Sequence, residues 1–116
     1  MLNLGIDIVS IDRIQSILNS DKELRFLNKL FSQQEIAASE NKVDQSQYFS
    51  GRFAAKEAVK KALSSYDISA RQSFKSIEIL NSKSGKPYVL SRSNQDINIS
   101  ISHDGNYAIA FCVIDK

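Results

Sequence analysis

The stretch Arg52-Phe53-Ala54-Ala55-Lys56-Glu57-Ala58-Val59-Lys60-Lys61-Ala62-Leu63 (RFAAKEAVKKAL, residues 52–63) lies within the longest helical pattern of the chain, which runs from residue 47 to about residue 65. On a helix with 3.6 residues per turn, its small and apolar residues form one stripe that is expected to face the core. Glu57 lies nearly opposite this stripe, on the same side as Phe53. An aromatic residue on the side that should face water suggests that a ligand or another subunit covers it. The stripe contains Ala55, Ala58, Val59, Ala62, Leu63 and Tyr66.

One strand and three short helices are expected before this central helix. Residues 2–9 alternate with the period of a strand, which places Asp7 on the face opposite to Ile6 and Ile8. Capping residues mark two helix starts, because Ser10 can accept a hydrogen bond from the first helix and Ser32 opens a capping-box sequence. Helices are therefore expected at residues 11–18, from about residue 22 to residue 30, and after residue 32.

Strands are expected after the central helix. Asp104-Gly105-Asn106 separates two alternating runs, which predicts a hairpin turn. The expected strands cover residues 76–80, 87–90, 97–103 and 107–114. An N-terminal strand and helices followed by a largely antiparallel sheet define an α+β fold. The 116 residues contain no linker and no repeat, so residues 1–116 are expected to form a single domain.

The composition argues against several classes of protein. The chain is 42% hydrophobic and 24% charged, as in ordinary globular proteins, and its net charge of +2 is too small to indicate nonspecific nucleic-acid binding. Its one cysteine, Cys112, cannot form a disulfide within the chain. The N-terminal apolar run is interrupted by Asp7 and Asp12, and no run approaches the roughly 20 apolar residues that cross a membrane. We therefore expect a cytoplasmic protein that binds neither nucleic acid nor membrane.

Two carboxylates, those of Asp7 and Glu57, are candidates for chemistry. Asp7 stands between two isoleucines, so it is expected to need a cation, a metal or several N–H donors, unless it caps the helix that follows. Glu57 and Lys61 have the i,i+4 spacing of an ordinary surface salt bridge, which is the alternative to a catalytic role. Arg52 and Lys56 add positive charge to the same helix, which favours an anionic ligand.

The one histidine, His103, ends an alternating strand beside the expected hairpin turn, and it is either a structural residue or part of a site. One histidine without a cysteine cluster gives poor support to a zinc site. Two carboxylates in basic surroundings match a site for Mg²⁺ and phosphate, because Mg²⁺ prefers oxygen ligands and lysines neutralise phosphate charge. A noncatalytic module that docks an acidic protein is the competing hypothesis.

Four motifs follow one another along nearly the whole chain: Gly5-Ile6-Asp7-Ile8, residues 52–58, Gly85-Lys86-Pro87-Tyr88, and Ser100-Ile101-Ser102-His103 with Tyr107-Ala108-Ile109-Ala110. Together they resemble the holo-acyl-carrier-protein synthases of the 4′-phosphopantetheinyl transferase family. The resemblance implies the phosphopantetheinyl transferase fold. It implies an enzyme that transfers the 4′-phosphopantetheine group of coenzyme A to a serine of apo acyl carrier protein, releases adenosine 3′,5′-bisphosphate, and supports fatty acid biosynthesis. It also implies a homotrimer that binds coenzyme A in clefts between subunits.

The resemblance assigns roles to individual residues as well. Mg²⁺ would be bound by Asp7 and Glu57, which are catalytic together with Lys61. The proton of the carrier serine would pass to Glu57 or to a metal-bound water. Contacts with coenzyme A are implied for Lys61 and His103 near its phosphates, for Gly85, Lys86 and Pro87 beside its adenosine, and for Arg52 at its 3′-phosphate, within one subunit or from a neighbouring one. Lys56 would bind substrate at the phosphates or make a subunit contact. The surface that receives the carrier protein would include Arg13, Ile17, Arg25 and Phe26.

Overall fold

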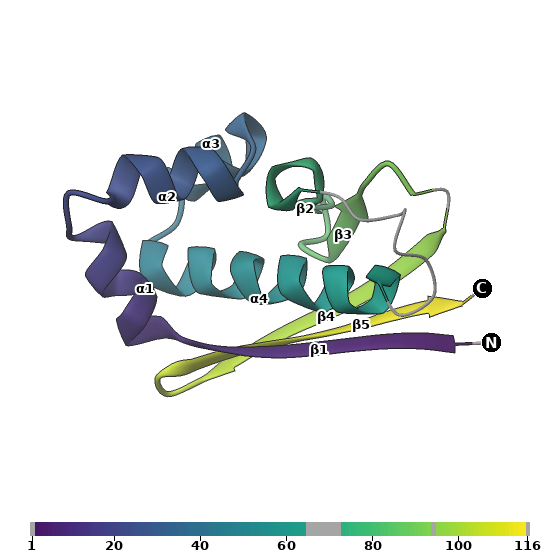
Figure 1. Cartoon of the computed structure of the whole chain (residues 1–116). Helices are drawn as coiled ribbons and strands as arrows, with labels where there is room; N and C mark the ends of the chain where they lie inside the picture. The colour runs from purple at the N-terminus through teal and green to yellow at the C-terminus, as the bar shows by residue number, and fades with distance from the viewer. Residues whose placement is uncertain (1, 65–72, 94, 116) are drawn as a thin grey trace.

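The computed structural model describes residues 2–64, 73–93 and 95–115. Its largest sheet has three antiparallel strands in the order β1 (Leu2–Ser10), β5 (Tyr107–Asp115) and β4 (Asp96–Asp104). The long helix α4 (Gln45–Ser64) packs on one face of this sheet and runs in the direction opposite to β1 (Figure 1). The α+β fold expected from the sequence is confirmed.

Smaller elements cover the other side of α4. They are α1 (Ile11–Leu18), α2 (Glu23–Leu30), α3 (Gln33–Ser39), the 3₁₀ helix η2 (Phe74–Ser76), and a two-stranded antiparallel sheet of β2 (Glu78–Asn81) and β3 (Pro87–Leu90). Figure 1 shows α2, α3 and the small sheet across α4 from the large sheet. Helix α4 is therefore a middle layer that other parts of the same chain contact from both sides.

Local capping signals predicted the starts of α1 and α3 correctly, whereas α4 begins at Gln45, two residues before the expected residue 47. The Ser10 hydroxyl accepts a hydrogen bond from the Arg13 N–H, and Ser32 and Glu35 form the expected capping box at the start of α3. The expected strand at residues 76–80 begins later, at Glu78, because the Ser73 hydroxyl caps a 3₁₀ turn there. No helix among the described residues has both the length and the apolar character to span a bilayer. That residues 1–116 form a single domain stays a prediction.

The apolar stripe predicted for α4 is buried in the core, apart from residue 66, which lies outside the described residues. On the opposite side of the helix, the Phe53 ring packs against the rings of Phe26 and Phe74, with centroid distances of 6.2 Å and 5.7 Å. The expectation that a ligand or another subunit covers Phe53 was wrong, because α2 and η2 of the same chain cover it.

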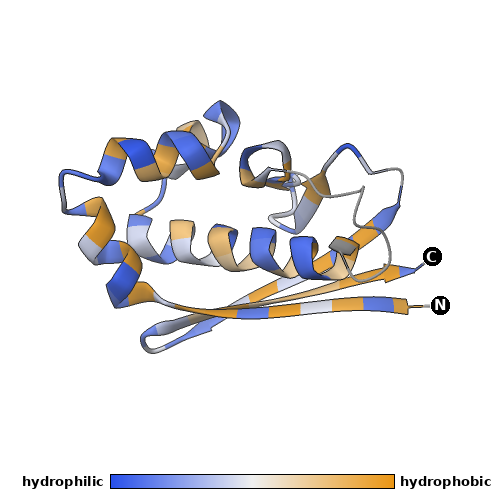
Figure 2. Cartoon of the chain, viewed as in Figure 1, coloured by the Kyte–Doolittle hydropathy of each residue, from blue (hydrophilic) through white to orange (hydrophobic). Residues whose placement is uncertain are grey.

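The face of the large sheet that points away from α4 is apolar over two of its three strands. Ile6 and Ile8 of β1 are 55% and 61% exposed. On β4 the residues of this face are polar, so the apolar area ends at that strand. Figure 2 shows the hydrophobic residues along β1. We call this area the outer apolar face; it consists of Leu2, Leu4, Ile6, Ile8, Tyr107, Ile109 and Phe111.

Candidate functional site

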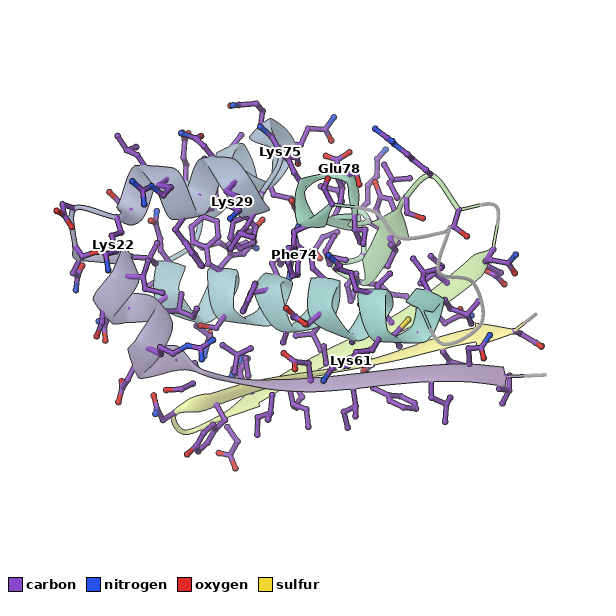
Figure 3. All side chains as sticks on the ribbon, viewed as in Figure 1. Lys22, Lys29, Lys61, Phe74, Lys75 and Glu78 are labelled. Carbon is purple, nitrogen blue, oxygen red and sulfur yellow. The ribbon has the colours of Figure 1, made fainter. Side chains whose placement is uncertain are left out.

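Asp7 and Lys61 form an ion pair between β1 and α4. Lys61 Nζ donates to Asp7 Oδ1 at 3.1 Å and to the Ile6 carbonyl oxygen at 2.9 Å. The Lys61 side chain is 53% exposed and that of Asp7 19% exposed, so both are open to a ligand from solvent. Figure 3 shows Lys61 between α4 and β1. The pair meets the requirement that Asp7, a carboxylate on the inner face of a strand, has a partner of opposite charge.

A glycine brings the helix close enough for this pairing. A Cβ atom on Gly5 would lie 1.8 Å from the Ala58 carbonyl oxygen, so only glycine fits where α4 crosses β1. Asp7 is two residues further along the same face of β1, toward the N-terminal half of the antiparallel helix. Side chains on a helix lean toward its N-terminus, which is how Lys61 reaches back to Asp7.

Glu57 joins Asp7 and Lys61 on this flank of α4. It lies one helical turn before Lys61, and residues spaced i,i+4 are neighbours on a helix surface. Its side chain is half-buried. The three residues expected to be catalytic therefore lie at the edge of the large sheet that is formed by β1. We call Asp7, Glu57 and Lys61 the β1-edge group.

The donor set of the β1-edge group fits a magnesium ion better than a softer metal. Asp7 and Glu57 supply carboxylate oxygens, which are the ligands that Mg²⁺ prefers. Within the described residues no group of three or more histidine, cysteine, aspartate and glutamate side chains gathers to enclose a metal. Two carboxylates leave coordination positions for water and for substrate phosphate, which is the usual way in which Mg²⁺ is bound.

Arg52 lies on the other flank of α4, beside β2. Its Nη2 donates to Asn81 Oδ1 at 2.7 Å, and its guanidinium group stacks 4.6 Å from the centre of the Tyr48 ring. The residue is only 9% exposed, and among the described residues no acceptor bonds its buried Nε. Burial raises the pKa of Tyr48. Arg52 is thus a fixed cation with a donor left over, which suits an anionic ligand.

His103 lies near Arg52, at the β4 edge of the large sheet. The side-chain amide nitrogen of Gln47 is hydrogen-bonded to His103 Nδ1 at 3.0 Å. Both His103 and Arg52 line a cavity of about 350 Å³, together with Lys42 and Asp44. Hydrogen bonds from the Gln47 N–H and the Ser46 hydroxyl lower the pKa of Asp44, which caps the start of α4. Sequence reasoning missed Lys42, whose only signal was a positive charge in the loop before α4.

The expected adenosine-binding turn belongs to this second flank. Gly85 has a positive φ of 88°, and it closes a tight turn in which Ser82 N donates to the Lys86 carbonyl oxygen at 2.9 Å. Lys86 and Pro87 line a hollow of about 320 Å³ between the small sheet and β4. We call Arg52, His103, Gly85, Lys86 and Pro87 the β4-edge group.

The expected site residues therefore form two groups instead of one. Asp7 pairs with Ala110 of β5, and His103 pairs with Ala108 of the same strand from its other side. Strand β5 lies between the two groups, so they are separated by two strand spacings, roughly 10 Å across the sheet. A single chain consequently presents the two halves of the expected site at opposite edges.

The expectation that Lys56 contacts substrate needs correction. Lys56 is fully buried, and its Nζ donates to Glu35 Oε1 at 2.6 Å, to the Phe74 carbonyl oxygen at 2.8 Å and to the Ile77 carbonyl oxygen at 2.6 Å. An ammonium group has three donors, and all three are used inside the core. Burial lowers the pKa of Lys56, and the Glu35 carboxylate opposes this shift. Lys56 has no donor left for a substrate.

The residues expected to receive a carrier protein lie on α1 and α2. Arg13 and Arg25 are exposed, whereas Ile17 is half-buried. Phe26 is half-buried, because it packs against Phe53 and against Phe31 of the core.

The tip of the β4–β5 hairpin holds the start of α1. There the Asn106 side chain accepts from the Asp12 N–H at 2.8 Å, and the Asn106 carbonyl oxygen accepts from the Ile11 N–H at 2.8 Å.

Comparison with known proteins places this fold in a class of group-transfer enzymes. Residues 3–112 match the family model of the 4′-phosphopantetheinyl transferase superfamily. The chain belongs to that superfamily.

Individual members that resemble the chain over its whole length are holo-[acyl-carrier-protein] synthases. The protein of Thermodesulfovibrio yellowstonii is 42% identical over 112 residues, which cover 96% of each chain. The protein of Halalkalibacterium halodurans is 37% identical over 118 residues and covers 100% of this chain and 97% of its own.

Two solved structures of such synthases have the same fold. The structure from Bacillus anthracis, in complex with CoA (3′,5′-ADP), has a TM-score of 0.82 and 30% identity, covering 97% of this chain and 94% of that one. The structure from Helicobacter pylori, in complex with coenzyme A, has a TM-score of 0.82 and 34% identity, covering 97% and 99%.

Proposed function

We propose that this protein transfers the 4′-phosphopantetheine group of coenzyme A to a serine of apo acyl carrier protein, in support of fatty acid biosynthesis. The observation that carries this proposal is the β1-edge group, in which Asp7, Glu57 and Lys61 lie on one flank of α4 within a chain of the phosphopantetheinyl transferase superfamily. The products are holo carrier protein and adenosine 3′,5′-bisphosphate. Membership of a transferase family favours this enzyme over a noncatalytic docking module.

Asp7 and Glu57 are the residues that would hold Mg²⁺ in this enzyme. The ion supplies positive charge that offsets the charge of the pyrophosphate during transfer. Lys61 is exposed enough to leave Asp7 for a phosphate oxygen, and its ammonium group would stabilise the leaving bisphosphate. As the carrier serine attacks the β-phosphate it loses its proton, and either Glu57 or water accepts it.

The β4-edge group would bind the adenosine end of coenzyme A. Arg52, His103 and Lys42 line the same cavity, so a 3′-phosphate would meet three basic side chains there. The turn at Gly85, Lys86 and Pro87 would lie beside the adenosine. Lys56 has no part in this contact, since it is buried with Glu35.

We also propose that the active sites form between subunits of a homotrimer. Within one chain the β1-edge and β4-edge groups are on opposite sides of β5, so the β1 edge of one subunit and the β4 edge of the next would together make one complete site. The outer apolar face supports association, because a monomer rarely leaves seven large apolar side chains exposed on one side of a sheet.

The carrier protein would dock on α1 and α2, next to the β1-edge group. Arg13 and Arg25 are exposed cations that can attract an acidic helix, and Ile17 offers an apolar contact. Phe26 contributes the part of its ring that is not packed against Phe53. A cytoplasmic location, expected from the sequence, stays a prediction.

The direct test combines purified protein, coenzyme A, Mg²⁺ and an apo carrier protein, followed by intact-mass measurement of the carrier. We expect a mass gain of one phosphopantetheine group, which is lost when Mg²⁺ is removed with a chelator. Carrier whose acceptor serine is replaced by alanine serves as the control. An unchanged mass with several different carriers, at protein concentrations that sustain the oligomer, would refute the proposed function.

A further inference from the structure

Glu35 and Lys56 form a fully buried ion pair that the proposed chemistry does not use. Glu35 lies on α3 and Lys56 on α4, and their side chains are closed to solvent. Every charged donor and acceptor has a partner: Glu35 Oε1 accepts from Lys56 and from the Ser32 N–H at 2.9 Å, and Oε2 accepts from the Ile79 N–H at 2.9 Å. Removing charges from water is costly, so a buried ion pair often adds little to the stability of a protein. Its presence here therefore calls for an explanation other than stability.

The pair joins three separate segments of the chain. Besides its bond to Glu35, the Lys56 ammonium holds the carbonyl oxygens of Phe74 and Ile77, and Glu35 holds the N–H of Ile79. These backbone groups belong to η2, to the residue that follows it, and to the first half of β2. The pair therefore fixes where β2 starts relative to α3 and α4. Figure 3 shows Phe74 directly above α4.

Two short connections lead from the pair to Arg52. Strand β2 ends at Asn81, whose Oδ1 accepts a hydrogen bond from Arg52 Nη2. The Tyr48 hydroxyl donates to the Glu35 carbonyl oxygen at 2.8 Å, and the Tyr48 ring stacks on the Arg52 guanidinium. One contact that orients Arg52 thus comes from the strand that the pair holds in place, and the other comes from a ring bonded to the main chain of Glu35. The same strand leads through its turn to Lys86 and Pro87.

We propose that Glu35 and Lys56 are positioning residues for the coenzyme A end of the site: the pair sets the place of β2, the main chain of Glu35 holds Tyr48, and these in turn orient Arg52 and the Gly85–Pro87 turn. This inference rests on the proposed function. A buried and fully bonded polar network holds one arrangement rigidly, and an arginine that binds phosphate depends on the direction of its donors. The β1-edge group is on the other flank of α4, where Lys61 pairs with Asp7.

The test measures coenzyme A affinity and carrier affinity separately. In Lys56→Met, we expect the KM for coenzyme A and the Kd for adenosine 3′,5′-bisphosphate to rise by roughly tenfold or more, while the KM for the carrier stays within about twofold. A merely structural defect would reduce the fraction of active enzyme, which lowers kcat and leaves both KM values unchanged. Lys60→Met is the matched control, because Lys60 is on the same helix but stacks on the Phe74 ring instead of bonding Glu35.

Tyr48→Phe is a second variant that tests the same inference if Lys56→Met does not fold. It removes only the hydroxyl that donates to Glu35 and keeps the ring under Arg52, so we expect the affinity for adenosine 3′,5′-bisphosphate to fall in the same direction. Unchanged affinity in Tyr48→Phe, or an unchanged KM for coenzyme A in folded Lys56→Met, overturns the inference. Failure of the proposed function can be told apart from these two outcomes, because the wild-type protein itself would then neither bind coenzyme A nor modify a carrier.

Discussion

The Ala58 carbonyl oxygen of α4 lies so close to Gly5 of β1 that a Cβ atom on Gly5 would come within 1.8 Å of it. The helix rests directly on the strand backbone at this point. Asp7, two residues along the strand, is thereby brought under the Lys61 ammonium group, and Glu57 lies one turn away. One missing side chain thus decides whether the β1-edge group can assemble.

Replacing Gly5 with alanine is expected to lower the free energy of unfolding by about 3 kcal/mol, because α4 must move off the strand to make room for one methyl group. Urea unfolding followed by circular dichroism measures the change. Gly51→Ala is the control. Its Cβ would meet only the movable Ile101 side chain, at 3.2 Å, so that variant should be as stable as the wild type or slightly more stable. Equal stability of Gly5→Ala and the wild type would contradict the close approach.

Replacing Glu57 with glutamine is expected to lower kcat roughly 100-fold or more, because the shape is kept but the charge that would bind Mg²⁺ is lost. Asp7→Asn should have an effect of similar size. The assay is transfer to apo carrier, with circular dichroism and mass in solution as checks on fold and assembly. Glu40→Gln removes an exposed carboxylate elsewhere and should change nothing. Normal turnover by Glu57→Gln would return this residue to the role of a surface salt-bridge partner.

Introducing a charge into the outer apolar face is expected to dissociate the protein. Ile6→Asp places a carboxylate where the proposed trimer buries an isoleucine, and an unpaired buried charge is strongly unfavourable. Light scattering should report a monomer with normal circular dichroism and little transferase activity. Leu24→Asp puts the same charge on another exposed leucine, on α2, and should leave the oligomer intact. A wild-type protein that is itself monomeric would contradict the proposal.

The buried thiol of Cys112 makes stability depend on pH. Burial raises the pKa of Cys112 to about 11, from an ordinary value of 9.0. The folded state therefore keeps a proton that the unfolded state releases, so the contribution of this thiol to stability is complete below pH 9 and decreases as the pH rises through 11. The loss should reach roughly 2 to 3 kcal/mol. The measurement compares the free energy of unfolding of the wild type with that of Cys112→Ala across this pH range. A difference between the two proteins that does not change with pH would contradict this prediction.

The features that the sequence predicted correctly depend on neighbours in the chain. The Ser10 cap, the capping box of Ser32 and Glu35, and the hairpin turn at Gly105 each use residues within a few positions of one another. The apolar stripe of α4 was also predictable, since a helix places residues three and four apart on one face. The joint role of Asp7 and Glu57 stays a prediction that comes from the family motifs, since no spacing argument could join residues fifty positions apart.

The features that the sequence did not predict depend on tertiary contacts. Lys56 has the same appearance in the sequence as the exposed Lys61, and only the arrival of Glu35 from α3 makes its burial possible. Phe53 looked exposed because the rings that cover it, Phe26 and Phe74, come from segments on either side of α4 in the sequence. The separation of the expected site into two edges follows from the strand order, which places β5 between β1 and β4.

That strand order has a genetic consequence. If each active site takes the β1 edge from one subunit and the β4 edge from another, two inactive alleles can restore activity to each other. A chain with Asp7→Asn still offers an intact β4 edge, and a chain with Arg52→Ala still offers an intact β1 edge. Random mixing of the two in one cell leaves roughly a quarter of the sites with both edges intact. Two alleles damaged at the same edge would leave none, so complementation groups would map the two sides of the sheet.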